Sequence, residues 1–345
     1  MNKIVYLTGA GATKGEMAFK GLEADTSMTG ISENVYTMSK DADGSYGKLV
    51  DDLGLQLQEQ DIELIMSLFE SYLDLEDKKL SRINAEMRKL FRRYLISQIT
   101  DQINVPQLLT SLIHLHEKYD KSIGENGEKV LGFLTINYDN LLEDAFYRVY
   151  GRLNLGGSFE SEQYQFSDEV IPVLKLHGSF NWQIQEKTIL VAESIEQKED
   201  NNGWIPPSVY KKPAGNIVFQ SIWKQAKNLL TDCDILRVIG SNLRNEDWSL
   251  ISLLFTSQIE SKKVFEVELI VPNESAVGTE REKGIIERLG FLGKMKPPSL
   301  LPIFAEMIEE ENIFRSWLNN TATWISQKDP TIFEDRTIIE NLRWR

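Results

Sequence analysis

Polar residues that can bind or react with a ligand follow several apolar, strand-like stretches of this chain. Asn137 and Asp139 follow the stretch "GFLTI", and His177 with Gly178 follows "VLKL". An imidazole that is neutral near pH 7 can accept a proton, and amide and carboxylate groups can hold polar parts of a ligand. Ligands of open α/β sheets bind at the carboxyl ends of the strands. These residues are therefore candidates for one site.

Three further strand ends carry small or polar residues. They lie in "VYLTGAGATKG" at the start of the chain, in "VIGSNL" and in "IVPNES". The residues concerned are Gly9, Ala10, Gly11, Ala12, Thr13, Gly240, Ser241, Asn242 and Asn273. A Gly-Ala-Gly turn after a strand lets backbone N–H groups face a pyrophosphate.

The glycine-rich turn does not by itself establish phosphate binding. The third glycine of the dinucleotide pattern G-x-G-x-x-G would fall at the position of Lys14. No Gly-Lys-Ser/Thr follows at the spacing of a Walker A loop. From the residues alone, a phosphate-binding turn and a plain tight turn both remain open.

The candidate side chains also have purely structural interpretations. His177 can be a core histidine bonded to a neighbouring carbonyl, and Asn137 and Asp139 can cap the helix that begins "NLLEDAF". His114 and His116 have H-x-H spacing, which places them on different faces of a helix. We interpret those two as ordinary helix residues.

Composition excludes several classes of protein. Of the 345 residues, 41% are hydrophobic and 26% are charged, as in ordinary soluble globular proteins. The net charge of −14 would repel free duplex DNA, so direct nucleic-acid binding is not expected. No apolar run reaches about 18 residues, so no membrane span is expected. The N-terminus leads into a strand without the features of a signal peptide, which predicts a cytoplasmic protein.

A single cysteine limits the available chemistry. Cys233 excludes an intramolecular disulfide and any site built on several thiolates. Because "DILRVIG" follows it, we interpret Cys233 as a small buried residue near a strand. Trp182 and Trp204 are interpreted as packing residues.

The order of apolar runs predicts the fold class. Six runs have the composition of strands: 3–9, 130–138, 171–179, 216–219, 234–241 and 264–272. Several are nearly continuous, which is typical of strands covered on both faces. Helical patterns cover 139–151, 221–232 and 279–291. This alternation predicts an α/β fold with a Rossmann-like, doubly wound and mostly parallel sheet.

Two kinds of segment interrupt the alternation. Residues of about 50–125 show helical periodicity without a strand candidate, which predicts an inserted helical subdomain. Residues 22–48 are polar and contain glycine and serine, so we expect a loop that can cover a ligand. Residues 186–215, with three prolines, form a second irregular stretch.

The motifs divide the chain into two parts. We expect one domain over residues 1–290, including the helical insertion, and a C-terminal helical segment over 291–345. The C-terminal segment is a candidate contact surface for another subunit or a partner. The basic stretch "RKLFRRYL" at 88–95 is either a solvated helix face or a surface for an acidic partner or a subunit.

The ordered set of strand-end motifs resembles the sirtuin superfamily, and most closely its bacterial sirtuin-like branch. The resemblance runs from Gly9 to about Asn273. "GAG" is similar to the family's phosphate loop, "TINYD" to its Thr-x-Asn-x-Asp segment, and "LHG" to its catalytic His-Gly. "IGSNL" looks like its Gly-Thr-Ser-Leu element and "VPNES" like its adenosine-side asparagine segment.

The resemblance implies an NAD+-cleaving site with assigned roles. Residues 9–13 would hold the pyrophosphate, and Asn137 would position a water or a ribose hydroxyl. His177 would accept a proton, and Asp139 would hold the carboxamide or stabilise positive charge on the sugar. The groups after the later strands would bind the rest of NAD+; they are Gly240, Ser241, Asn242 and Asn273. The implied reaction is hydrolysis to nicotinamide and ADP-ribose, with a cyclised product also possible.

Departures from the family pattern argue against protein deacylation. Deacylase sirtuins carry a four-cysteine zinc site, which this chain cannot build, so no zinc or other metal is expected. Their Gly-Ile-Pro-Asp-Phe-Arg element has no counterpart in residues 15–48, and Asn242 stands where a serine is frequent. The NAD+-cleaving half of the chemistry is not affected by these losses.

Three functions therefore stay open at this point. The first is an NAD+ hydrolase that depletes NAD+ in antiphage defence. The second is a protein ADP-ribosyltransferase or deacylase, and the third is a sensor that binds NAD+ or ADP-ribose without cleaving it. The resemblance also implies a homo-oligomer activated by a separately encoded partner. A HerA-like hexameric ATPase is the leading candidate partner, and an Argonaute-type or phage-derived protein is the alternative.

Overall fold

The computed structural model describes the greater part of the first 270 residues. The described ranges are 2–22, 28–70, 78–99, 103, 105–110, 112–113, 128–192, 203–208, 217–241, 243 and 247–270. Several sequence predictions fall outside them: His114, His116, Asn242, Asn273, the helix at 279–291 and the C-terminal segment 291–345.

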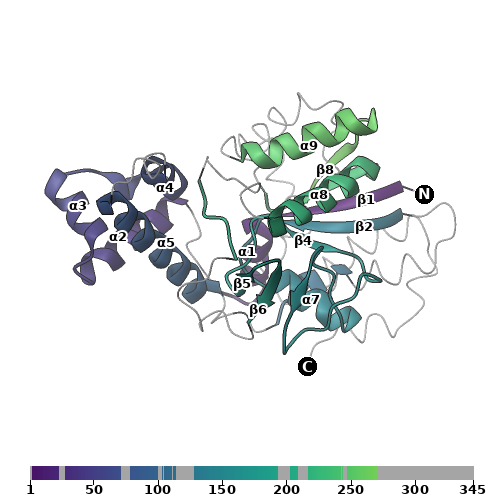
Figure 1. The fold of residues 1–345 in the computed structure, drawn as a ribbon, viewed down its shortest axis with the longest axis horizontal. Helices are drawn as coiled ribbons and strands as arrows, with labels where there is room; N and C mark the ends of the chain where they lie inside the picture. Colours follow the sequence, from purple (N-terminus) through teal and green to yellow (C-terminus); the bar gives the residue numbers. More distant parts are fainter. Residues whose placement is uncertain are drawn as a thin grey trace.

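A five-stranded parallel sheet forms the centre of the molecule, which confirms the predicted fold class (Figure 1). Its strands, in the order in which they pair, are β4 (Val173–Lys175), β2 (Glu128–Thr135), β1 (Asn2–Thr8), β7 (Ile235–Ile239) and β8 (Glu266–Ile270). The strand order reverses at β1, so the crevice between β1 and β7 is the topological switch point where such sheets bind ligands.

The sheet is buried by helices on both faces. In Figure 1, α8 (Ile217–Asp232) and α9 (Trp248–Ser261) lie above the sheet, and α7 (Leu141–Tyr150) lies below it. The apolar runs of β1 and β7 are buried throughout their centres, because both of their faces are covered. As the sequence indicates, α7 ends at Gly151, which adopts the left-handed conformation of a helix C-cap.

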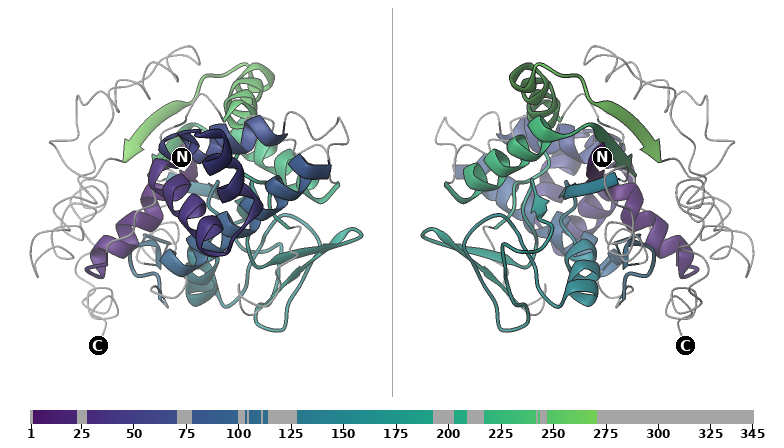
Figure 2. Two further views of the ribbon diagram at one scale, coloured as in Figure 1. Left: turned by 90° about the vertical axis from the view of Figure 1, so that its left-hand side faces the viewer. Right: turned by 90° about the vertical axis from the view of Figure 1, so that its right-hand side faces the viewer.

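A small second sheet follows α7 and was not predicted (Figure 2). It contains β3 (Phe159–Glu160), β6 (Thr188–Val191) and β5 (Trp182–Gln185), and β5 and β6 form an antiparallel hairpin. Trp182 is fully buried there and packs edge-on against Phe159, which confirms it as a packing residue. The hairpin lies partly inside the stretch 186–215 that we expected to be irregular; strands this short carry little periodic signal.

Helices fill most of the segment between the first two strands. After α1 (Ala10–Phe19) come α2 (Met28–Asp41), α3 (Ser45–Leu53), α4 (Ile62–Glu70) and α5 (Lys78–Ile99), with a short turn of 3-10 helix between α3 and α4. The expectation of a loop over 22–48 is therefore wrong, since α2 and the start of α3 occupy most of it. The misleading signal was composition: α2 is polar on average but buries Ile31, Val35 and the small Ser32.

Two further elements differ from the sequence prediction. A strand was predicted at 216–219, but residues 217–219 form the first turn of α8. The buried residues of this helix recur at helical spacing through Val218, Ile222, Ala226 and Leu230. A four-residue apolar run does not distinguish a strand from a buried helix turn. Helix α9 was missed because it is apolar around much of its circumference. No helix of the described residues is long and apolar enough to cross a membrane.

The basic stretch at 88–95 is largely a packed part of α5. Leu90, Phe91, Tyr94 and Leu95 are buried, and Arg92 donates a hydrogen bond of 3.0 Å to the carbonyl of Phe180. The helix is thereby joined to the loop after β4. The stretch as a whole is therefore neither a solvated helix face nor a free contact surface.

Cys233 lies just before β7, as the sequence indicates. It is buried, and its thiol donates a hydrogen bond of 3.0 Å to the carbonyl of Ile235. Burial raises the pKa of this thiol to about 12. The side chain therefore behaves as a small apolar residue rather than a nucleophile.

Candidate active site

The loops after β1 and β7 meet closely at the switch point. The amide of Gly9 donates to the carbonyl of Ile239 (2.9 Å), and that of Gly11 donates to the carbonyl of Gly240 (2.8 Å). A Cβ on Gly240 would lie 2.2 Å from the amide nitrogen of Ala12, and Gly240 has a φ of +64°. Glycine is therefore required by contact and by conformation.

The glycine-rich turn is the beginning of a helix. Gly9 is the N-cap residue of α1, and Ala10 to Thr13 form its first turn. The amides of Gly11 and Ala12 are bonded to the carbonyls of Gly240 and Gly9, so the helix dipole is the feature that favours an anion at this end. A helix start facing the crevice favours the phosphate-binding interpretation over a plain tight turn.

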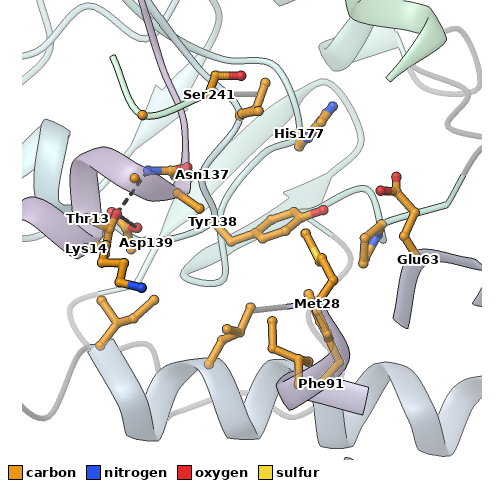
Figure 3. Close-up of a pocket in the computed structure, with 18 of the residues that line it drawn as sticks. Thr13, Lys14, Met28, Glu63, Phe91, Asn137, Tyr138, Asp139, His177 and Ser241 are labelled. Carbon is orange, nitrogen blue, oxygen red and sulfur yellow. Dashed lines mark hydrogen bonds between the residues drawn. The ribbon is translucent and has the colours of Figure 1, made fainter. Parts of the chain in front are cut away.

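Asn137, Thr13 and Asp139 form a hydrogen-bonded group beside this helix start (Figure 3). The amide nitrogen of Asn137 donates to the carbonyl of Gly9 and to the hydroxyl of Thr13, both at 3.0 Å. The Thr13 hydroxyl donates to Oδ2 of Asp139 at 2.7 Å. Because the nitrogen of Asn137 is committed, its oxygen is the end that is left to accept a hydrogen bond from a ligand or water.

Asp139 is held from both sides. Its Oδ1 accepts the amide of Leu141 (3.1 Å) in the first turn of α7, while Oδ2 accepts the Thr13 hydroxyl. The carboxylate thus caps the helix and also fixes Thr13, which agrees with the capping interpretation of this residue. These contacts favour an organising role; the expected contact with a carboxamide stays a prediction.

His177 follows β4 and lines the same cavity as Asn137 (Figure 3). It is 3% exposed, and its ring centroid is 6.2 Å from that of Tyr138. Tyr138 donates its hydroxyl to the carbonyl of Ile205 at 2.8 Å, and the amide of Ile205 donates to the carbonyl of His177. Segment 203–208 therefore holds both residues.

The helical layer supplies the opposite wall. Figure 3 shows Phe91 of α5 and Met28 of α2 facing Tyr138. The cavity has a volume of about 600 Å³, within the usual range for small-ligand sites. Its apolar lining from the helical layer consists of Met28, Ile31, Phe91, Leu95 and Ile99.

Charged groups lie at different ends of the cavity. Lys14, in α1, is the only lysine or arginine among the described lining residues, and Figure 3 places it beside Thr13 and Asp139. Glu63 lies on the far side of Tyr138 in that view, and Asp61 and Asp247 also line the wall. Burial raises the pKa of Tyr138 well above its ordinary value, and the negative charges of Glu63 and Asp247 add to this effect.

The structure brings most of the predicted site residues together. The predicted residues that line the cavity are Ala10, Gly11, Thr13, Asn137, Asp139, His177, Gly240 and Ser241. Gly9 is bonded to the lining residue Asn137 through its carbonyl. Ala12 is buried behind the turn, whereas Asn242 and Asn273 lie outside the described residues. Trp204 does not line the cavity; it stacks on Phe91 with ring centroids 6.0 Å apart, as a packing residue.

Several lining residues were missed. Tyr138 was within a quoted motif, "TINYD", and its position between two candidates was a usable signal. The residues of the helical layer gave none, because an apolar helix face predicts burial without saying against what. Among the described residues, no group of three or more His, Cys, Asp or Glu is placed to hold a metal ion.

Comparison with known proteins finds a family model that matches the part of the chain around this site. No curated protein matches the chain. Among solved structures, one similar chain is Sir2 in complex with the inhibitor EX-527, 2'-O-acetyl-ADP-ribose and a deacetylated p53 peptide. It is 13% identical, covers 92% of this chain and 94% of its own, and has a TM-score of 0.40. The family model of the SIR2-like domain matches residues 132–254, the part that carries Asn137, His177 and Gly240.

Proposed function

We propose that the protein is an NAD+ glycohydrolase that cleaves NAD+ to nicotinamide and ADP-ribose. The observation that carries the proposal is the joining of Asn137 to the start of α1. Through Gly9 and Thr13, the amide of Asn137 is bonded to the turn that favours a phosphate, and His177 lines the same cavity. One bound molecule can thus present a phosphate to the turn and a sugar to Asn137 and His177.

In the proposed reaction, water replaces nicotinamide on the sugar. The bond between C1' of the ribose and the ring nitrogen breaks, and its electron pair leaves with nicotinamide, which becomes neutral. The water oxygen bonds to C1', and its proton passes to a base and then to solvent. Asn137 accepts a hydrogen bond from the water through its side-chain oxygen, and His177 is the base.

The helical wall favours a small substrate over a protein side chain. Met28 and Phe91 lie on the side of the cavity that faces Tyr138, and Leu95 also lines the cavity. Water can accept the ADP-ribosyl group without a further channel that would admit a protein side chain. This supports hydrolysis over transfer to a protein, and it leaves a cyclised product as an outcome of the test.

Product analysis separates the candidate functions. We would incubate the full chain with NAD+ labelled in the adenylate and separate the products chromatographically, for wild type, His177→Ala and His177→Gln. Equal amounts of nicotinamide and ADP-ribose from the wild type, and loss of on the order of 100-fold in both variants, are expected. Label on protein would indicate a transferase. NAD+ bound at the site with no nicotinamide released, with or without the partner candidates, would indicate a sensor and contradict the proposal.

We also propose that the enzyme works in a cytoplasmic antiphage defence assembly. A homo-oligomer joined by a HerA-like hexameric ATPase is the leading arrangement, with an Argonaute-type or phage-derived partner as the alternative. Exposed apolar side chains on α9 support assembly, since Trp248 is 64% and Ile259 is 60% exposed. Size-exclusion chromatography of Trp248→Asp against wild type tests this: we expect a shift to smaller species, and a wild-type monomer with and without the ATPase would contradict it.

A further inference from the structure

A buried ion pair lies behind the candidate site and plays no part in the proposed reaction. Lys175, the last residue of β4, and Glu143, in the first turn of α7, have side chains that are 0% and 3% exposed. The lysine Nζ lies 2.8 Å from Oε1 and 3.0 Å from Oε2 of Glu143. Both oxygens of the carboxylate are therefore within reach of one ammonium group.

The same ammonium group also binds the loop that carries Asn137. Lys175 Nζ donates a hydrogen bond to the backbone carbonyl of Asp139. The side chain of Asp139 in turn accepts the Thr13 hydroxyl, and that hydroxyl accepts the amide nitrogen of Asn137 at 3.0 Å. An unbroken series of contacts thus runs from Lys175 to Asn137.

Lys175 is also close in sequence to the other candidate catalytic residue. It stands two positions before His177, at the end of the same short strand. The backbone beyond it turns sharply, with the amide of Gly178 donating to the carbonyl of Lys175 at 3.1 Å. The lysine thus connects the segment bearing His177 with the loop bearing Asn137.

Stability alone does not account for this pair. Desolvating two charges costs several kcal/mol, and apolar residues of similar volume are often as stable or more stable in such places. A buried pair that also fixes a backbone carbonyl has a second effect, because it specifies one geometry. A misplacement of about 1 Å in a reacting group can cost about 100-fold in rate.

We propose that Lys175 and Glu143 are positioning residues that hold Asn137 and His177 in their reactive arrangement. This inference rests on the proposed NAD+ hydrolysis, but it makes a separate claim about the loop at residues 136–141. Without the pair, that loop would lose its anchor to β4 while the strands themselves remain formed. The fold would persist and the reacting groups would lose their alignment.

The test compares an apolar replacement with a charge-only change. In the double variant Glu143→Leu/Lys175→Met, shape is kept and both charges are removed; in Glu143→Gln, only the acidic charge is removed. The matched control is Arg152→Met, which breaks the exposed ion pair of Arg152 with Glu169. Each full-length chain is examined by thermal unfolding, by amide hydrogen exchange and by nicotinamide release.

We expect the double variant to unfold within a few degrees of wild type. Exchange of the amides in 136–141 should be faster by about tenfold or more, while that of β2 stays unchanged. The kcat should fall by about 100-fold with KM changed only a few-fold. Glu143→Gln should show the same changes to a smaller extent, and Arg152→Met none.

Two results would overturn the inference. Wild-type exchange over 136–141 in Glu143→Gln and in the double variant would mean that the pair does not hold the loop, whether or not the chain releases nicotinamide. Faster exchange with an unchanged kcat in an active enzyme would mean that the loop position does not matter. If the double variant fails to fold, Glu143→Gln alone decides. A wild type that releases no nicotinamide counts against the proposed function, and the exchange result still decides the claim about the loop.

Discussion

The two walls of the cavity are built by different means. The sheet-side wall consists of loops after β1, β2, β4 and β7, tied together by hydrogen bonds such as Asn137 to Gly9 and Gly11 to Gly240. The helical wall contributes packed apolar side chains from α2 and α5, with carboxylates from the region of α4. Hydrogen bonds fix atoms to within a few tenths of an ångström, whereas apolar packing tolerates substitution of similar volume. We therefore propose that the first wall carries the chemistry and that the second encloses the ligand.

The largest effect should come from filling the contact between the β1 and β7 loops. Gly240→Ala places a Cβ 2.2 Å from the Ala12 nitrogen at a φ of +64°. We expect the free energy of unfolding to fall by on the order of 4 kcal/mol, from overpacking and left-handed strain together, and ADP-ribose binding to be lost. Chemical denaturation measures the free energy of unfolding, and calorimetry measures the binding of ADP-ribose.

A matched glycine separates strain from contact. Gly151 has a similar φ of +68°, but a Cβ added there would point into open space, with no atom within 4 Å. Gly151→Ala should cost only about 1 kcal/mol and leave ADP-ribose binding unchanged. Equal effects of the two substitutions would mean that the close approach of the loops does not matter.

The next effect concerns the hydroxyl that joins Asn137 to Asp139. Thr13→Val keeps the shape of the side chain and removes a donor to one group and an acceptor for the other. We expect kcat for nicotinamide release to fall roughly tenfold, because a buried carboxylate oxygen loses its partner and Asn137 is less well held. Thr13→Ser retains the hydroxyl and should stay within about threefold of wild type; a similar loss in both variants would argue against the network.

A pH effect of intermediate size should report the buried pair behind the sheet-side wall. Burial raises the pKa of Glu143 from 4.5 to about 7, although the charge of Lys175 opposes the shift. A raised folded-state pKa gives stability that is present below about pH 4.5 and lost as pH rises through about 7. Between about pH 5 and 8, wild type should therefore lose on the order of 2 kcal/mol relative to Glu143→Gln, measured by urea unfolding. A parallel dependence in both proteins would contradict this assignment.

The smallest effect is expected on the helical wall. Leu95 is a buried lining residue of α5, and Leu95→Met changes its shape but not its volume class. We expect a loss of less than about 1.5 kcal/mol in stability and a change of only a few-fold in KM, with kcat kept. A large fall in kcat would remove the distinction between the two walls.

The difference between the walls also explains what the sequence could predict. The sheet-side residues were found because strand ends are marked twice, by an apolar run and by the glycine or polar residue that follows. No knowledge of distant contacts was needed to select Asn137, His177 and Gly240 as candidates. The helical wall was missed because Met28 and Ile31 fall in a polar segment whose burial depends on α5, far away in sequence. The prediction failed for short strands such as β3 and for the helix start at 217–219. A run of so few apolar residues is compatible with both a strand and a buried helix turn.

The resemblance to a known family assigned roles to the site residues, which the local sequence pattern could not do. It did not predict the contacts that surround those residues. It implied roles for Asn137 and Asp139 without indicating that Thr13 lies between them. It gave no indication that Lys175 and Glu143 meet, because a charged residue in a short strand is normally expected at a surface. Those contacts depend on tertiary packing, which spacing along the chain does not record.

Nicotinamide release by Asn137→Ala, measured beside Asn140→Ala, decides whether the sheet-side wall carries the reaction. Asn140 has the same side chain three residues on, but it donates to Asp144 and does not line the cavity. We predict that the kcat of Asn137→Ala falls by on the order of 100-fold or more, with ADP-ribose still bound, and that Asn140→Ala stays near wild type. Equal rates for the two variants would show that the sheet-side wall does not carry the reaction.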